Sequence, residues 1–397
     1  MLWLNSKTDR PDFNWFKTFL ESRSAQGIRV KVPSEKVRVA SRLASEAADW
    51  LRDNCGIDNP NSPKQVVDYM MSVRDSNIDA CCTVRGKLSS AQDGLIGLAE
   101  LGYKWAMQLI KYRTNANLVK NVSSVMGCAD GDNLVHPEIS LQKTNRISYK
   151  APALMNISKE VLWDMIQPMY ENDYLWSVDI RNQEPWILAH MTGAKKLIEL
   201  AEKASDSGSS MYKAVYMDIF GHEIESEEAY DEMKRAWNML TYGGTLQGLL
   251  PRCKVINAET VFNYFKNIKE LSDYRGRTFG LAKKMVQSAT TVFGTTVFTD
   301  AVGGHLQRSL MDIPIQGTGA DILCLITQRI EAELSDMFGG ESPIRIYFTR
   351  HDELIFDVDR GWQDENGSDT VKGLLKDVCS HRIDDWTAFG LDVEQLN

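Results

Sequence analysis

The stretch of sequence that decides the fold is LWSVDIRNQEPWILAH, residues 175–190. Its first five residues form a short, mostly apolar run, which is typical of a β-strand. The run ends in a carboxylate, Asp179, where the chain becomes polar. The sequence therefore predicts a strand with an acidic residue at its end.

Two further strand-like runs, residues 344–348 and 353–358, flank Asp352 and Glu353. Strands that bring Asp179 and Asp352 side by side would hold hard cations such as Mg²⁺, which prefer carboxylate oxygens. Two ions about 4 Å apart stabilise both the attacking and the leaving oxygen of a phosphoryl displacement. Acidic residues are also common at strand ends and turns, so spacing alone leaves an ordinary structural role open.

The segment KRAWNMLTYGG, residues 234–244, carries Lys234, Asn238 and Tyr242 at four-residue steps, hence on one helical stripe. A cation, an amide and an aromatic ring on one face suit a nucleoside triphosphate, since lysine neutralises phosphate and tyrosine packs on a base or sugar. The structural alternative is a solvated helix end capped by Gly243.

Another segment, LMDIPIQGTGADI at residues 310–322, contains two glycines but lacks the Gly-Lys-Ser/Thr of a phosphate-binding loop. Pro314 is expected to weaken or kink a helix there. This segment says little by itself.

The 397 residues suffice for two or three domains, and residues 34–118 have a helical pattern. Ser62 before Pro63 predicts a helix start. Four residues are predicted to share one helix face: Val39, Leu43, Ala47 and Trp50. Three later stretches are also helical in pattern: 227–242, 259–272 and 305–335. The predicted class is α+β with an all-helical front.

The net charge of −9 argues against a simple basic coat for nucleic acid. The charge is unevenly spread, because residues 1–150 hold 21 basic and 16 acidic residues and the remainder holds 24 and 38. Such a split can mark a polyanion-binding part beside an acidic one, or only solvated helix faces.

Seven cysteines without a C-x2-C pair give poor support to disulfides or zinc. No signal peptide and no apolar run of about 18 residues is found, so a cytoplasmic chain with no membrane contact is expected.

Taken together and in this order, these segments resemble the polymerase domain of family A DNA polymerases, the bacterial DNA polymerase I type. That family's first signature is Asp-Tyr-Ser-Gln-Ile-Glu-Leu-Arg followed by Leu-Ala-His. Asp179, Glu184 and residues 188–190 match it in register. Lys234 and Tyr242 match the family's fingers helix. The remaining matches are His351, Asp352 and Glu353 on a hairpin, the segment 314–322 with Arg308 eight residues before Gln316, and TNRISYKAPALMNI at 144–157.

The resemblance implies a right-hand polymerase fold with a helical thumb, an antiparallel-sheet palm and helical fingers. The implied boundaries are an N-terminal extension at 1–34, the thumb at 35–140, the palm at 141–190 and 305–397, and the fingers at 191–304. The implied reaction is template-directed extension of a primer 3′-hydroxyl with dNTPs. Its implied cofactor is a pair of Mg²⁺ ions, with Mn²⁺ as a substitute.

The resemblance also assigns roles to residues. Asp179, Asp352 and the backbone carbonyl of Ile180 would hold the ions, with Glu353 auxiliary. Lys234 would bind the triphosphate and protonate the leaving group. Glu184 would block the ribose 2′-hydroxyl of the incoming nucleotide. Tyr242 would lie near the templating base pair. Residues implied on primer or template are Arg146, Asn156, Arg308, Asp312, Gln316 and His351.

Several positions depart from the family pattern. Tyr230 stands in place of the fingers-helix arginine, Asn238 in place of an aromatic, and Tyr212 aligns with a family histidine near the triphosphate. Lys213 and Arg235 are the cations expected to compensate, and all five positions stay nucleotide-binding candidates. In the first signature, three residues replace Ser, Gln and Arg: Arg181, Asn182 and Trp186.

The 34 residues before the implied thumb leave no room for the proofreading exonuclease that often precedes it in the family. We therefore expect a chain that lacks its own exonuclease, with a separate exonuclease or processivity subunit as a possible partner besides primer–template DNA and dNTPs. The alternative is that this sequence is a fragment of a longer polymerase. The compact form suits a phage or plasmid, acting in the cytoplasm of a bacterium or infected cell.

Two other functions compete with this prediction. A single-subunit RNA polymerase fits Lys234 and Arg235, but Glu184 and Glu353 favour DNA. A catalytically inactive, polymerase-like DNA-binding subunit fits the altered fingers helix, but the intact Asp179 and Asp352 oppose it.

Overall fold

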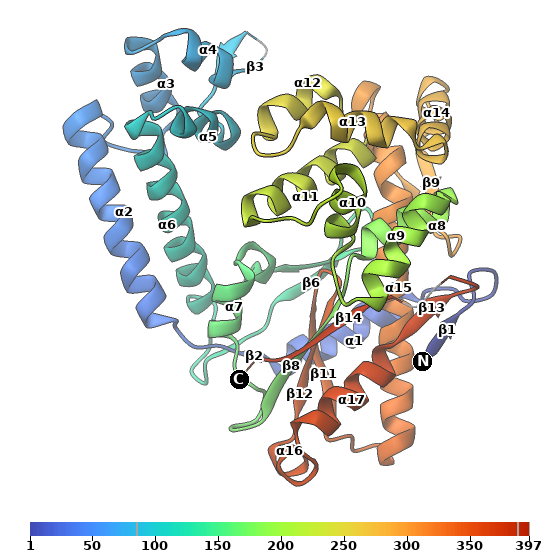
Figure 1. Cartoon of the computed structure of the whole chain (residues 1–397). Helices are drawn as coiled ribbons and strands as arrows, with labels where there is room; N and C mark the ends of the chain where they lie inside the picture. Colours follow the sequence, from blue (N-terminus) through green and yellow to red (C-terminus); the bar gives the residue numbers. More distant parts are fainter. Residues whose placement is uncertain (85, 387–388, 397) are drawn as a thin grey trace. The chain divides into compact units, whose positions relative to one another are not determined.

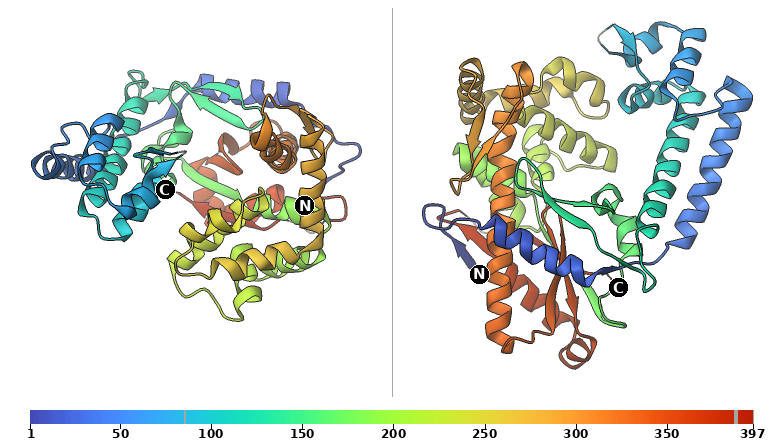
Figure 2. Two further views of the ribbon diagram at one scale, coloured as in Figure 1. Left: turned by 90° about the horizontal axis from the view of Figure 1, so that it is seen from above. Right: turned by 180° about the vertical axis from the view of Figure 1, so that it is seen from behind.

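The computed structural model describes residues 1–84, 86–386 and 389–396. Contacts within the chain divide it into two compact units. Unit 1 comprises residues 1–28, 138–150 and 168–397, and unit 2 comprises residues 29–137 and 151–167. The ribbons in Figures 1 and 2 show that unit 1 combines a sheet with many helices, whereas unit 2 is mainly helical.

The main sheet of unit 1 has four antiparallel strands in the order β11-β12-β8-β14. Their bounds are Tyr174–Ile180 for β8, Ile344–Arg350 for β11, Glu353–Val358 for β12 and Leu391–Gln395 for β14. The first three lie where the sequence predicts strands, and β14 is an addition. Every side chain of β12 and most of β8 are buried, which explains their apolar composition.

Helices pack against this sheet. The 36-residue helix α15, Gly303–Phe338, contacts β11, while α17, Ser368–Cys379, contacts β8 and β14. Helix α1, Phe13–Gln26, contacts α15 and β11, and α16, Arg360–Asn366, packs against α17. Pro314 lies inside α15 without ending it. Close to it, the buried hydroxyl of Tyr274 donates to the carbonyl of Met311 at 2.9 Å.

The remaining helices of unit 1 follow one another between β8 and α15. They are α8 (Gln183–Thr192), α9 (Lys195–Asp206), α10 (Met211–Phe220), α11 (Glu227–Thr241), α12 (Leu246–Leu249), η2 (Leu250–Arg252), α13 (Ala258–Asn267) and α14 (Lys269–Lys283). The prediction of one helical stretch over 259–272 is wrong, because the backbone of Ile268 is extended and separates α13 from α14.

Three small two-stranded sheets complete the part of unit 1 that the structure describes. They are β1 (Leu2–Leu4) parallel to β13 (His381–Ile383), β6 (Glu138–Leu141) with β7 (Ile147–Lys150), and β9 (Ser288–Thr290) with β10 (Thr296–Phe298). The first of these sheets ties the N-terminal segment to unit 1.

Unit 2 is built on α2, Ser34–Cys55, packed along α6, Lys104–Met126. Its other helices are α3 (Pro63–Ser72), α4 (Ser76–Cys82), α5 (Gln92–Glu100), η1 (Leu154–Asn156) and α7 (Lys159–Met165). Its strands are β2 (Ile28–Arg29), β3 (Thr83–Val84), β4 (Lys87–Leu88) and β5 (Leu134–Val135). The prediction of an all-helical front is therefore wrong in detail, since short strand pairs interrupt the helices.

Two local predictions in unit 2 have different outcomes. The Ser62 side chain accepts a hydrogen bond from the Gln65 N–H with Pro63 in the first turn, which confirms the helix start. The predicted face of α2 is correct at Ala47 and shifted by one residue at its other three positions. The buried residues are Ala40, Ala44, Ala47 and Leu51. Small alanine side chains let α2 and α6 pack closely, and the larger neighbours stay half-buried at the sides.

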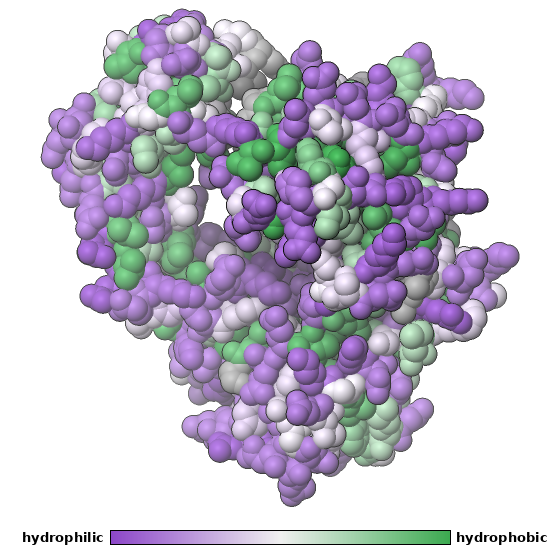
Figure 3. Space-filling view, in the orientation of Figure 1, coloured by the Kyte–Doolittle hydropathy of each residue, from purple (hydrophilic) through white to green (hydrophobic). Residues whose placement is uncertain are grey.

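The face of the chain in Figure 3 is mostly hydrophilic, with apolar residues in small scattered groups. Of the helices in the described ranges, none combines the length and the apolar character needed to cross a membrane.

Candidate active site

The two predicted metal aspartates come from neighbouring parts of the main sheet. Pairing of β12 with β8 places Glu353 opposite Asp179, and Asp352 directly precedes Glu353. The N–H of Ile180 donates to the carbonyl oxygen of Asp352 at 3.2 Å, which ties the end of β8 to the turn before β12. His351 takes a left-handed φ of 55° in that turn. The sheet thus gathers three acidic residues at one end of two strands.

The carboxylates of Asp179 and Asp352 repel one another, and a bound cation would relieve this repulsion. Burial raises the pKa of Asp352, and the nearby negative charge of Asp179 raises it further. In the described ranges, no three His, Cys, Asp or Glu side chains gather into a metal-binding group of their own. Mg²⁺ does not need one, because it binds through one or two carboxylates and fills its shell with water and substrate phosphates. Two carboxylates beside the last carbonyl of β8 therefore fit the predicted ions.

Glu184 is the centre of a hydrogen-bonded network that joins three elements. Its carboxylate, in the first turn of α8, accepts hydrogen bonds from the Arg146 guanidinium before β7 and from the Tyr242 hydroxyl at the end of α11. Burial, with the charge of Glu184 second, raises the pKa of Asp312 on α15 to about 6. The structure thus brings together Glu184 and Tyr242, which are predicted to bind nucleotide. It places Arg146 and Asp312, which are predicted to bind DNA, beside them.

Of the stripe predicted on α11, Lys234 and Asn238 are exposed, whereas Tyr242, directly after the helix, is half-buried. The neighbouring Arg235 is exposed as well. The same helix is anchored from its buried side by Glu232, which is 2% exposed. The Glu232 carboxylate accepts three backbone hydrogen bonds, from Lys254 at 2.8 Å and from Val255 and Ile256 at 3.0 Å. This contact fixes the loop after η2 to α11, and sequence spacing gave no sign of it.

The departures at the start of α11 form one contact group with α10. The Tyr230 hydroxyl donates to the Ser210 side chain at 3.2 Å, and its ring meets the ring of Tyr212 edge-on at 6.1 Å. The Lys213 ammonium lies 5.8 Å from the centre of the Tyr230 ring. A cation therefore lies beside the tyrosine that replaces the expected arginine.

The predicted DNA-binding residues fall in two places. Arg308, Asp312 and Gln316 are four residues apart on α15 and so share one stripe. His351 and Arg146 belong to unit 1 as well. Burial and the charges of two nearby arginines, Arg350 and Arg146, lower the pKa of His351. Asn156 lies in unit 2 at the end of η1, where its carbonyl accepts a hydrogen bond of 2.9 Å from Asn121.

The three departures named above, Arg181, Asn182 and Trp186, fit the local structure. Arg181 pairs with Asp392 of β14 at 3.1 Å, and Asn182 takes a left-handed φ of 54° that asparagine tolerates. Trp186 stacks on His190 with ring centres 5.0 Å apart, and His190 stacks on Trp386 at 4.7 Å. Burial lowers the pKa of His190 to about 4, so the stacked imidazole is neutral at pH 7.

Comparison with known proteins bears on this geometry. The sequence model of the family described as "DNA polymerase family A" matches residues 35–383. The chain belongs to DNA polymerase family A. This membership confirms the resemblance drawn from the five motifs.

Relatives and solved structures agree with the family. This family A chain is 26% identical over 289 residues to DNA polymerase theta of Drosophila melanogaster, covering 64% of the chain and 14% of that protein. It is 23% identical over 387 residues to DNA polymerase I of Mycobacterium tuberculosis strain H37Rv, covering 90% of the chain and 40% of that protein. The chain thus spans well under half of these curated relatives.

A solved structure shares the fold. It is the POL domain of Pol1 from M. smegmatis in complex with DNA primer–template and dNTP, with a TM-score of 0.77 and 22% identity, covering 96% of this chain and 69% of that chain. The family A polymerase fold and the α+β class predicted from the sequence are therefore confirmed.

Proposed function

We propose that the chain is a template-directed DNA polymerase that extends a primer 3′-hydroxyl with dNTPs by two-metal phosphoryl transfer. The observation that carries this proposal is the position of Asp179 and Asp352 at one end of the paired strands β8 and β12, in a chain of family A. In the reaction the hydroxyl oxygen bonds to the α-phosphorus, the bond to the bridging oxygen breaks, and pyrophosphate leaves.

Asp179, Asp352 and the carbonyl of Ile180 would hold the ions, with Glu353 in an auxiliary role. Mg²⁺ held by these residues would supply positive charge that favours loss of the proton from the 3′-hydroxyl and that stabilises the leaving pyrophosphate. The raised pKa of Asp352 supports this assignment, because a cation relieves the repulsion from Asp179.

For the nucleotide, the exposed Lys234 would neutralise the triphosphate and protonate the leaving group. Lys213 and Arg235 would supply charge in place of the arginine replaced by Tyr230, with Tyr212 and Asn238 beside them. Glu184, held by Tyr242, would occupy the space of a ribose 2′-hydroxyl and so favour deoxynucleotides.

The proposed DNA contacts of unit 1 are to sugar, phosphate and minor groove, which carry little sequence information. The residues that would make them are Arg146, Arg308, Asp312, Gln316 and His351. Asn156 in unit 2 would add another. We propose the thumb at 35–140, the palm at 141–190 and 305–397, and the fingers at 191–304. Unit 2 also includes residues 151–167, inside the proposed palm range.

We further propose a role in replication in the cytoplasm of a bacterium or a phage-infected cell, with an exonuclease or processivity subunit as a separate partner. Bacterial relatives among the matches support this setting.

The test is extension of a labelled primer on a template with Mg²⁺, using dNTPs and rNTPs in parallel. Asp179→Asn and Asp352→Asn should each abolish extension while primer–template binding persists. Asp364→Asn, which removes a carboxylate that contacts Tyr174 and Arg360, is the matched control and should extend normally. Binding without extension by the unchanged chain would instead favour an inactive DNA-binding subunit, and extension with rNTPs alone would favour an RNA polymerase.

A further inference from the structure

The segment 274–299, which contains most of α14 and the strands β9 and β10, differs in charge from the sequence around it. It holds four lysines and arginines and no Asp or Glu, whereas residues 151–397 as a whole hold 24 basic and 38 acidic residues. The next carboxylate along the chain, Asp300, is paired with the Lys143 ammonium. A local excess of cations in an acidic part of a chain favours a polyanion as its ligand.

One face of α14 is open to solvent and carries an aromatic ring among these cations. Phe279 is 46% exposed, and the Lys283 ammonium lies 4.4 Å from the centre of its ring. A Cβ atom added at Gly276 or Gly280 would meet no atom within 4 Å, so the helix surface beside the ring is unobstructed. The opposite face of the helix is buried through three residues: Leu271, Tyr274 and Thr278.

A second exposed ring lies on the hairpin that follows α14. Phe298, the last residue of β10, is 73% exposed and pairs with Ser288 of β9. Four residues take the chain from Lys284, at the end of α14, to Ser288, a distance of at most about 14 Å. Figure 1 shows β9 next to the end of α14. A strand of a few nucleotides is therefore long enough to reach both rings.

The cations around the rings are available to a ligand. Arg277, Lys283 and Lys284 are exposed, and none of them has an ion-pair partner among the residues that the structure describes. Such cations bind phosphate, and exposed rings stack on bases. A duplex hides the faces of its bases, and a protein interface would leave unpaired charges at its core. The combination of rings and cations therefore favours single-stranded nucleic acid.

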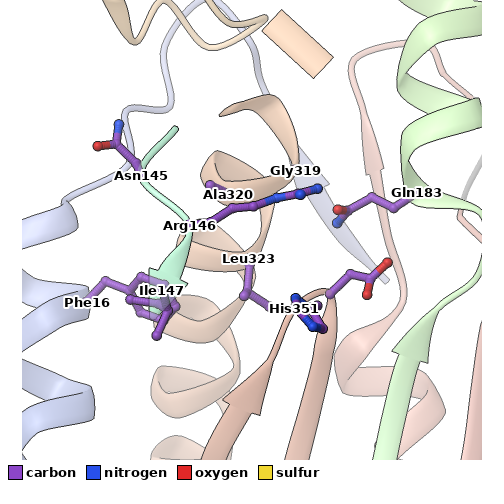
Figure 4. A pocket seen from close by; sticks show the side chains of 10 residues that line it. Phe16, Asn145, Arg146, Ile147, Gln183, Gly319, Ala320, Leu323 and His351 are labelled. Carbon is purple, nitrogen blue, oxygen red and sulfur yellow. The ribbon is translucent and has the colours of Figure 1, made fainter. Parts of the chain in front are cut away.

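We propose that this part of unit 1 binds single-stranded DNA, with bases stacked on the two rings and phosphates held by the three cations. The residues of this α14 surface are Arg277, Phe279, Lys283, Lys284 and Phe298. The inference goes beyond the proposed function, because none of these residues belongs to the candidate active site or to the predicted DNA contacts. Arg146 and His351, which line the pocket in Figure 4, come from other elements.

The α14 surface is attached to the helix that carries Lys234. The guanidinium of Arg275, on α14, donates a hydrogen bond to the carbonyl of Leu240 near the end of α11. Primer extension presents single-stranded DNA from two sources, the template ahead of the primer end and the strand displaced from a duplex ahead of it. Both sources offer the same unpaired bases and phosphates, so the experiment has an arm for each.

The test compares the unchanged chain with the double variant Phe279→Ala, Phe298→Ala, by the dissociation constants of labelled DNA in the absence of dNTPs. The DNAs share one primer stem and end blunt, in a template overhang of about twelve thymidines, or in a downstream duplex with a thymidine flap of the same length. The double variant should bind DNA with a single-stranded arm at least about ten-fold more weakly, because base stacking is lost. Its affinity for the blunt DNA should be unchanged, which also shows that it folds.

The two arms identify the source of the strand. A loss on the overhang DNA assigns the α14 surface to the template, and a loss on the flap DNA assigns it to the displaced strand. Equal dissociation constants of the two proteins on both DNAs would overturn the proposal. If the unchanged chain fails to extend a primer, the proposed function fails, but this comparison still decides the role of the α14 surface, since it needs no turnover.

A matched variant and a matched DNA separate stacking from charge. Tyr170→Ala removes another exposed ring, which has the Arg345 guanidinium 4.8 Å from its centre, and should bind every DNA as the unchanged chain does. An arm of abasic residues keeps the phosphates but has no bases, so on it the difference between the unchanged chain and the double variant should disappear. A difference that persists on abasic DNA would contradict stacking on Phe279 and Phe298.

Discussion

Glu184 and Tyr242 are joined by a hydrogen bond of 2.8 Å, although 58 residues separate them in the sequence. Glu184 lies in the first turn of α8 and Tyr242 directly follows α11, so the position of the carboxylate depends on the helix that carries Lys234. Discrimination between sugars is therefore expected to depend on both helices.

Removing the Tyr242 hydroxyl should loosen sugar selection without abolishing it. Tyr242→Phe should raise rNTP use relative to dNTP use about five-fold, because one hydrogen bond to Glu184 is lost. Glu184→Ala should raise it further, since the blocking side chain itself is gone. The measurement is kcat/KM for single incorporation of each nucleotide. Tyr170→Phe, at an exposed tyrosine, is the control, and unchanged selectivity in both site variants would contradict the assigned role.

The cation beside Tyr230 should contribute to triphosphate binding. Lys213→Ala is expected to raise KM for dNTPs about ten-fold with little change in primer–template affinity, because one charge near phosphate is lost. Adding Tyr230→Arg should restore much of the loss by returning a guanidinium to the neighbouring position. Lys203→Ala, an exposed lysine of α9, is the control. An equal increase of KM in Lys203→Ala would contradict this prediction, because it would show that any exposed lysine contributes through its charge alone.

The buried carboxylate of Glu232 should matter for stability rather than chemistry. Glu232→Ala leaves three backbone N–H groups without their acceptor and should lower the free energy of unfolding by about 1–3 kcal/mol. Glu228→Ala, in the exposed first turn of α11, should change it by less than about 0.5 kcal/mol. Urea denaturation of the two variants makes the comparison, and equal effects would rule out the anchoring role.

Asp321 should make stability depend on pH. Burial raises its pKa to about 7, although the hydroxyls of Thr291 and Thr295 donate to it. Between pH 4 and 7 the folded chain keeps a proton that the unfolded chain has lost, so this residue's contribution to stability falls as pH rises through that window.

Asp321→Asn should remove this dependence and raise the free energy of unfolding by on the order of 2 kcal/mol at pH 8. Denaturation at pH 5.5 and pH 8 measures it, with Asp364→Asn as the exposed control. The quantity compared is the difference in unfolding free energy between Asp321→Asn and the unchanged chain, because Asp312 and Asp352 also have raised pKa values and titrate in both proteins. A difference that is the same at pH 5.5 and pH 8 would contradict the role of Asp321.

The sequence predicted those strands and helix starts that depend on residues close together in the chain or on a short motif. The strand that ends beside Asp179 and the two strands that flank Asp352 are short apolar runs, and Ser62 with Pro63 is a local helix signal. Their structures follow from neighbouring residues alone, so these predictions hold.

What escaped prediction depends on contacts between distant segments. The ion pair of Arg146 with Glu184 and the anchoring of residues 254–256 by Glu232 each join separate elements. The buried face of α2 differs from the predicted one because apolar residues at helical spacing lie on two neighbouring stripes, and close packing against α6 selects the stripe rich in alanine.

The place of β8 between β12 and β14 has a consequence for the newly made chain. Residues 174–180 leave the ribosome long before residues 353–358 and 391–395, the two strands that flank them. At about 5–20 residues per second, β8 waits on the order of ten to thirty seconds with both hydrogen-bonding edges open. An apolar strand in that state readily joins other chains. Slower translation or crowded nascent chains should therefore favour aggregation, and chaperones that shield this strand during synthesis should raise the yield of folded protein.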